Sequence, residues 1–219
     1  MKTIKFLSLA GLLLSASFLN SCKDDSDSQI DPVTETTSKK STYQEKIKFI
    51  TNDIGHKGSN YEITQDDIDK YVGIVGYKGE KPSVEEVNSI SQNVSANYGA
   101  DYKDLLKKYN YSADATSIIN TIITNSYFKD VASAKGYERL TNAEKAVVGQ
   151  INDMVKDYTL NPESNPFERR IDCTINGQES PCWLAGGIGG AIIGGACCGP
   201  VGAVIGGVVG AVFGSLGDK

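Results

Sequence analysis

The residues best suited to chemistry in this 219-residue chain are its five cysteines. Cys22 directly follows a small residue, Ser21, and lies far from the other four. If Cys22 is modified, an even number of cysteines remains, which suits one or two disulfides in an oxidising compartment. The disulfide candidates all lie near the C-terminal end of the chain: Cys173, Cys182, Cys197 and Cys198.

Two kinds of disulfide pairing fit the sequence. The Asn-Gly dipeptide at 176–177 favours a tight turn, so a small hairpin could bring Cys173 next to Cys182. These two could equally reach Cys197 and Cys198 and attach the segment before the glycine-rich tail to the tail itself. The four cysteines lack the paired two-residue spacing of a structural zinc site, so we expect disulfides and no metal.

Other residues offer little for catalysis. The single histidine, His56, lies between glycines and is better explained as a solvated loop residue than as a base. Asp66, Asp67 and Asp69 fit capping and the helix dipole, because the glycine and later glutamate of a calcium loop are missing. The sequence has no phosphate-binding glycine loop and no nucleophile elbow. We therefore predict that the protein is not an enzyme and has no cofactor.

The charge balance argues against nucleic acid as a partner. The chain has 22 Lys and Arg against 27 Asp and Glu, which gives a formal net charge of -5. Binding to a phosphate backbone requires clustered positive charge. We therefore predict no nucleic-acid interface.

Residues 1–21 are typical of a signal peptide. A short basic start precedes an uncharged apolar run, residues 6–19, that is too short for a mature membrane helix. The run ends in Leu-Asn-Ser-Cys at 19–22, and together with the acidic run that follows it resembles the lipobox of Bacteroidota-type bacterial lipoproteins. This resemblance implies a lipid such as palmitate on Cys22, membrane lipid as a partner, and a location at the outer membrane or cell surface.

The polar residues 22–40 predict a flexible tether, and residues 41–160 predict a helical domain. In the second segment, apolar residues recur at spacings of three and four, as on one face of a helix. No stretch shows sustained period-two alternation, so we predict an all-α fold with a small bundle of five or six helices and an unidentified protein partner. Three capping boxes mark helix starts: Thr64 with Asp67, Ser83 with Glu86, and Thr141 with Glu144.

Residues 161–182 contain prolines that predict a linker with a possible disulfide hairpin, and residues 183–217 form a glycine-rich apolar tail. As one helix the uncharged tail would extend about 51 Å, beyond a hydrocarbon core of about 30 Å. Gly-Pro at 199–200 divides it, so we predict an apolar helical hairpin. Glycines recur every four residues along each arm: Gly186, Gly190 and Gly194, then Gly202, Gly206, Gly210 and Gly214.

A stripe of glycines lets two helix backbones approach closely, as small residues do in membrane helix pairs. Glycine costs about 1 kcal/mol relative to alanine in a soluble helix, so the hairpin suits a bilayer better than water. We expect it to associate with the membrane and to join copies of the chain into a homo-oligomer. The alternative is a buried or disordered glycine-rich tail in a soluble protein.

Residues 186–195 and 202–210 resemble the glycine-zipper hairpins of outer-membrane lipoproteins in the 17 kDa surface antigen class, in which the zipper lies closer to the lipidated cysteine. They also resemble glycine-zipper bacteriocins, whose apolar hairpins insert into a target membrane. The first resemblance implies an envelope lipoprotein with a structural or interaction role, and we favour this function. The second implies a surface-tethered, membrane-active toxin, which is the alternative.

Overall fold

A computed structural model describes residues 42–57, 62–161 and 173–216 of the chain. The predicted signal peptide, the tether, Cys22 and much of the predicted linker lie outside the described residues. Of the described residues, 74% are helical, in seven α-helices and two 3-10 turns, and a two-stranded sheet is also present, which confirms the prediction of a mostly helical fold.

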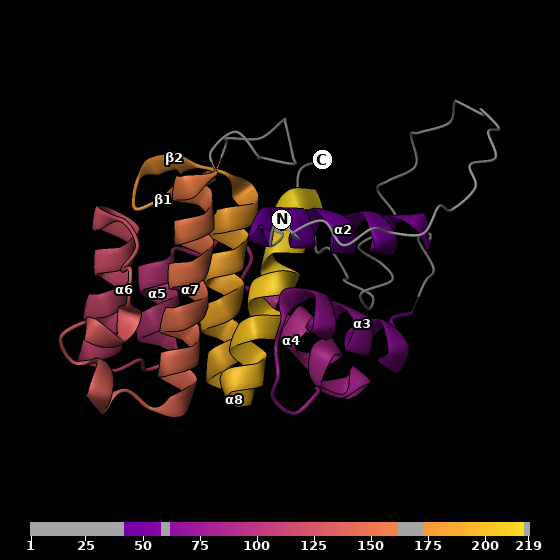
Figure 1. Cartoon of the computed structure of the whole chain (residues 1–219), viewed down its shortest axis with the longest axis horizontal. Helices are drawn as coiled ribbons and strands as arrows, with labels where there is room; N and C mark the ends of the chain where they lie inside the picture. Colours follow the sequence, from indigo (N-terminus) through magenta and orange to yellow (C-terminus); the bar gives the residue numbers. More distant parts are fainter. Residues whose placement is uncertain (1–41, 58–61, 162–172, 217–219) are drawn as a thin grey trace, which may run out of the picture.

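Helices α2 to α7 fill the segment for which the sequence predicts five or six helices, and a small sheet and a long apolar element follow (Figure 1). The elements in chain order are α2 (Tyr43–His56), α3 (Gln65–Val75), α4 (Val84–Ala96), α5 (Tyr102–Lys108), α6 (Ala113–Asn125), the 3-10 turns η2 (Val131–Ser133) and η3 (Tyr137–Arg139), α7 (Asn142–Leu160), β1 (Cys173–Ile175), β2 (Gln178–Ser180) and α8 (Cys182–Leu216).

Capping boxes determine where several helices begin. The predicted boxes that start at Thr64, Ser83 and Thr141 are present, with the hydroxyl and the acid each accepting from a backbone N–H. Thr42 and Glu45 form a fourth box at the start of α2, which was not predicted although its spacing is the same. These side chains satisfy amides that the first helical turn leaves without partners.

Glycine ends one of these helices but not another. α3 ends before Gly76, whose φ of 83° is left-handed. Gly55 lies within α2, so His56 is an exposed helical residue and not the loop residue that the sequence predicts. A single glycine costs only about 1 kcal/mol in a helix, which is too little to end α2, where Ile47 and Ile50 are buried.

α8 is a helical hairpin at the centre of the molecule (Figure 1). The chain leaves helical geometry at Cys198, with φ of -136°, and at Gly199, with φ of 65°, and Pro200 begins the second arm. The turn therefore lies where the sequence predicts it. α7 and α4 make the most extensive contacts with the hairpin, and α5 and α2 complete its cover.

The predicted helical domain and the predicted hairpin share one hydrophobic core. Ile47 of α2, Ile90 of α4 and Ile151 of α7 are buried in the same cluster as Ile192 and Ala203 of α8. An amphipathic helix must place its apolar stripe against another apolar surface, and α8 supplies that surface. The boundary predicted between 41–160 and 183–217 therefore does not separate two cores.

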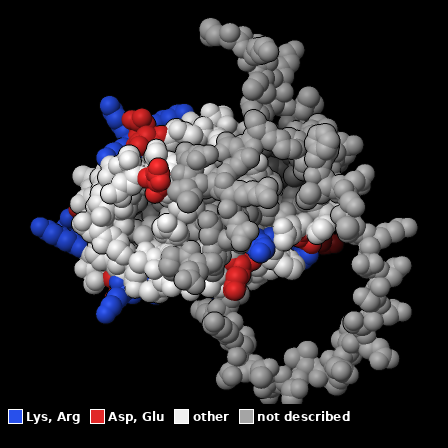
Figure 2. Space-filling view, turned by 90° about the horizontal axis from the view of Figure 1, so that it is seen from above, with Lys and Arg blue, Asp and Glu red and all other residues white. Residues whose placement is uncertain are grey.

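Charged side chains lie on the outside of this core. Figure 2 shows Lys, Arg, Asp and Glu side chains around the margins of the visible face. Among the described residues, the buried charged side chains are Asp67 and Glu144. Both are capping-box acids, so their burial serves helix starts and not a reactive centre.

Candidate functional site

The two arms of α8 contact each other through their glycines. A Cβ atom at Gly190 would collide with the carbonyl oxygen of Gly206, and a Cβ at Gly206 would collide with the carbonyl oxygen of Gly190. Because the obstructing atoms belong to the backbone, no rotamer change can relieve the collision. All seven glycines predicted to pack helices lie in this interface: Gly186, Gly190, Gly194, Gly202, Gly206, Gly210 and Gly214.

This zipper is closed within one chain. Gly186 faces Gly210 at one end, Gly194 faces Gly202 near the tip, and Gly214 lies against the backbone of Cys182. The glycine stripe of each arm is thus covered by the other arm. A second copy of the chain could use the stripe only if the two arms separated.

A second row of glycines, which was not predicted, fits the hairpin against α7. Each of these glycines directly follows a zipper glycine, in the doublets at 186–187, 194–195 and 206–207. The hairpin therefore has two faces without side chains, one toward the other arm and one toward α7. The doublets are visible in the sequence, but the partner of their second residue is not. The contacts are Gly187 with Met154, Gly195 with Val147, and Gly207 with Gln150.

An aromatic cluster fixes the base of the hairpin. The ring of Trp183 lies 6.3 Å from that of Tyr43 and 6.4 Å from that of Tyr158, measured between centroids. Trp183 is buried, and its Nε1 has no hydrogen-bond partner among the described residues. Burial also raises the pKa of Tyr43, whose hydroxyl accepts a hydrogen bond from Gln150. α2, α7 and α8 therefore meet around one large apolar side chain.

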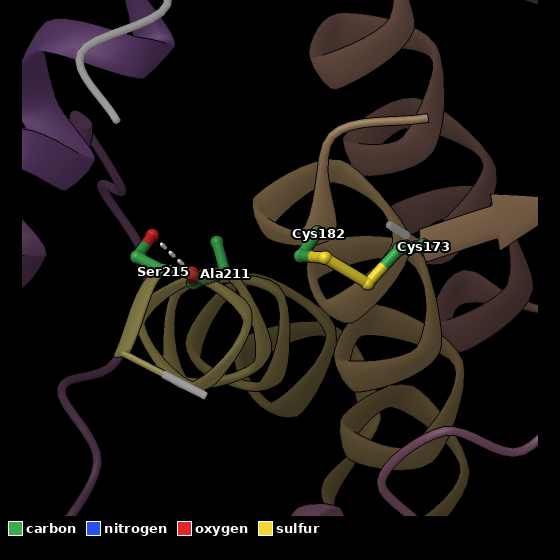
Figure 3. The surroundings of a disulfide bond; sticks show 4 residues. All are labelled: Cys173, Cys182, Ala211 and Ser215. Carbon is green, nitrogen blue, oxygen red and sulfur yellow. Dashed lines mark hydrogen bonds between the residues drawn. A yellow bond between two sulfur atoms is a disulfide. The ribbon is translucent and has the colours of Figure 1, made fainter. Parts of the chain in front are cut away.

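Cys173 and Cys182 form a disulfide that ties β1 to the start of α8 (Figure 3). β1 and β2 pair antiparallel around a turn at Asn176 and Gly177, where φ is 54° and 75°. Both angles are left-handed, as a two-residue hairpin turn requires. Of the pairings that the sequence leaves open, this is the one present. Figure 3 also shows Ser215 of the second arm, whose hydroxyl donates a hydrogen bond to the backbone carbonyl of Ala211 in the same arm.

The other two candidate cysteines, Cys197 and Cys198, are free thiols at the tip of the hairpin. Cys197 is exposed, and its Sγ lies 2.7 Å from the Sγ of Cys198. Partial burial of the sulfur and the neighbouring Cys198 thiol raise the pKa of Cys197 to about 12. At neutral pH the thiol form therefore prevails.

Two cavities flank the hairpin on opposite arms. A cavity of about 80 Å³ between α2, α3, α4 and the second arm is lined by apolar side chains, among them Ile68 and Phe213. A larger cavity of about 330 Å³ lies between the α4–α5 connection, β1 and the first arm. Its lining includes Tyr98 and Tyr102, and Asp101 is the one charged residue among the described residues that line it.

The acidic residues considered for metal binding are not brought together as ligands. Asp67 caps α3 and pairs with Lys57, Asp69 pairs with Lys81 at 2.6 Å, and Asp66 is exposed in the first turn of α3. Across residues 42–57, 62–161 and 173–216, no group of three or more His, Cys, Asp or Glu side chains could hold a metal ion.

Comparisons of the chain with protein-family models, with curated proteins and with solved structures found no match. Within the part of the chain that the structure describes, α8 is the one helix long and apolar enough to cross a membrane, by length and composition alone. Half of its most apolar stretch is buried in the fold. Its exposed residues lie at the tip and at the end of the second arm: Ala196, Cys197, Pro200 and Leu216.

Proposed function

We propose that the protein is a cell-envelope lipoprotein, attached at the outer membrane or cell surface by a lipid on Cys22, with a folded body in a structural or interaction role. The lipobox-like residues 19–22 support the attachment. The role of the body rests on one observation, the fit of Gly187, Gly195 and Gly207 against α7. In this proposal the lipid holds the protein at the membrane and the hairpin stabilises the body.

The second glycine row favours a protein core over a membrane hairpin. In a bilayer, the face between the two arms needs small residues, whereas a face that contacts lipid does not. In this chain the face toward α7 is also smooth, and a Cβ at Gly195 would collide with the side chain of Val147. Packing of the hairpin against α7 in its own bundle accounts for that requirement, which a face in contact with lipid would not have.

A second function, membrane insertion by a surface-tethered bacteriocin-like toxin, is favoured by the absence of charge in the hairpin. No charged side chain lies between Trp183 and Leu216, and a helix satisfies its own backbone amides, so a bilayer could accept both arms. Insertion would require α2, α3, α4 and α7 to move away from the second arm. The apolar cavity of about 80 Å³ lies at that interface.

Membrane fractionation separates the two functions. Full-length protein and a Cys22→Ala variant are expressed in a bacterium that lipidates exported proteins, with labelled palmitate in the medium. We expect label and membrane association in the wild type, and a soluble, unlabelled Cys22→Ala variant, because the hairpin is occupied inside the fold. The matched control is Cys197→Ala, which should keep both the label and the membrane association.

Three results would overturn the proposal. A Cys22→Ala variant that has lost its signal peptide and still stays with the membrane after alkaline extraction would mean that the hairpin itself is inserted. Dye release from lipid vesicles by the folded Cys22→Ala protein would favour the toxin function. A wild-type protein without label would remove the lipid attachment.

A further inference from the structure

The cysteine pair at the tip of the hairpin has no part in the proposed function. Cys197 and Cys198 are consecutive, their sulfurs lie 2.7 Å apart, and Cys197 is exposed. We propose that they form a redox site that closes reversibly into a vicinal disulfide when it meets an oxidant of the disulfide class, such as oxidised glutathione.

The local backbone makes this meeting of sulfurs possible. In a regular α-helix, consecutive side chains point about 100° apart around the axis and do not face each other. Cys198 has left helical geometry, with φ of -136° and ψ of 18°, and Gly199 follows with φ of 65°. The turn therefore brings together two thiols that a continuous helix would hold apart.

Oxidation of Cys197 and Cys198 needs no reactant other than the disulfide oxidant. One cysteine first loses its proton to water. Its thiolate, a minor species at neutral pH, then attacks a sulfur of the oxidant, which releases one thiol and leaves a mixed disulfide on the protein. The thiolate of the second cysteine then attacks the protein sulfur of that mixed disulfide and releases the second thiol. The pair loses two electrons and two protons, and one oxidant disulfide becomes two thiols.

The new disulfide should be easier to reduce than Cys173–Cys182. The Cα atoms of Cys173 and Cys182 lie 5.0 Å apart, within the usual range for a disulfide. Consecutive Cα atoms are only about 3.8 Å apart across a trans peptide, so a vicinal bond must distort the backbone. Strained and exposed disulfides are the labile ones. We therefore infer one structural and one redox-active pair in the same chain.

Closure of the pair would affect the end of the zipper. The position of a Cβ at Gly202 lies 2.7 Å from the Cβ of Cys198, and Gly202 also faces Gly194 across the hairpin. A ring closed through Cys198 therefore restrains the turn that sets the spacing of the last zipper contact.

Mass spectrometry in glutathione buffers tests the site. A full-length Cys22→Ala protein, in which the result does not depend on lipidation, is equilibrated at increasing ratios of oxidised to reduced glutathione, quenched in acid and alkylated. Chymotryptic cleavage after Trp183 and Phe213 then gives a fragment whose only cysteines are Cys197 and Cys198. With rising ratio, we expect this fragment to change from two alkyl groups to none, with the loss of two hydrogens. Cys173–Cys182 should remain oxidised in more reducing buffers than the tip pair.

The matched control is Cys198→Ser, in which ring closure is impossible and Cys197 should carry a single glutathione. The proposal is overturned if the wild-type fragment carries two alkyl groups or two glutathiones at every ratio. It is also overturned if the fragment is linked to a second copy of the chain, or if Cys173–Cys182 is reduced first.

Discussion

The hairpin α8 and the helices that surround it, α2 to α7, are held together by different interactions. The hairpin has no charged side chain, and its arms contact each other through backbone atoms at glycines. Four of the surrounding helices, α2, α3, α4 and α7, begin at capping boxes, and this region also has ion pairs such as Arg139–Asp114. The hairpin thus requires the absence of side chains at fixed positions, whereas the surrounding helices require particular side chains to be present.

This difference explains how a glycine-rich helix can be stable inside a protein. Each glycine costs about 1 kcal/mol relative to alanine in a helix. The apolar residues between the glycines, such as Ile188, Ile192 and Ile193, are almost fully buried, and each such burial contributes about 1.5–3 kcal/mol. The surrounding helices provide that burial, so the hairpin depends on them as much as they depend on it.

The largest effect is expected where the arms touch. Gly206→Ala should lower the free energy of unfolding by about 3 kcal/mol, because the added Cβ collides with the backbone at Gly190 and the arms must separate. The control is Gly149→Ala in α7, where a Cβ meets nothing within 4 Å and helix propensity predicts a gain of about 1 kcal/mol. Urea unfolding followed by circular dichroism measures both. Equal stability of the two variants would show that the arms are not in close contact.

A somewhat smaller loss of stability is expected where the hairpin contacts α7, and a second substitution in α7 should reduce that loss. Gly195→Ala should cost about 2 kcal/mol, since its Cβ collides with the side chain of Val147. Val147→Ala alone should also destabilise the protein by about 2 kcal/mol, because it opens a cavity in the core. The double variant should be more stable than the sum of the single losses predicts. If the two losses are strictly additive in a double-mutant cycle, Gly195 and Val147 are not in contact, and the proposed role of the hairpin loses its support.

The sequence predicts the parts of this structure that depend on local chemistry. The capping pairs at Thr64, Ser83 and Thr141 and the turn at 199–200 follow from residue types at fixed spacings, and all are present. The row formed by the second glycine of each doublet was missed, because a glycine shows that something approaches closely but not which element does. Burial of the tail in a protein core was only the alternative to a membrane hairpin for a related reason, since an apolar face fits lipid and protein equally well.

The third prediction concerns the surrounding helices. The buried carboxylate of Glu144 connects the start of α7 to the start of α6. It accepts hydrogen bonds from the backbone N–H of Thr141, at the start of α7, and of Ser112, at the start of α6. Burial acts to raise the pKa of Glu144, but these hydrogen bonds outweigh it and hold the pKa below its usual value. Glu144→Gln should lower the free energy of unfolding by about 2 kcal/mol at pH 7.

The pH dependence of this loss follows from the direction of the shift. A carboxylate with a lowered pKa stabilises the fold above its unfolded-state pKa of about 4.3, and this contribution disappears as the pH falls through the folded value. The difference between wild type and Glu144→Gln in urea unfolding should therefore shrink below about pH 4. Glu86→Gln is the matched control, because Glu86 occupies the same position of a capping box but is exposed and serves α4 alone. A larger loss in Glu86→Gln would contradict the bridging role of Glu144.

The smallest effect is expected at the Arg139–Asp114 pair, although its geometry is good. Nε and Nη2 of Arg139 each donate to a carboxylate oxygen of Asp114 at 2.7 Å, and these hydrogen bonds lower the pKa of Asp114. Arg139 is exposed, so water and salt screen the attraction between the two charges. Asp114→Asn should shift the urea midpoint slightly at low salt and leave it unchanged at high salt. A loss at high salt as large as that of Gly206→Ala would mean that the surrounding helices depend on this surface pair as the hairpin depends on its glycines, and the contrast between the two regions would not hold.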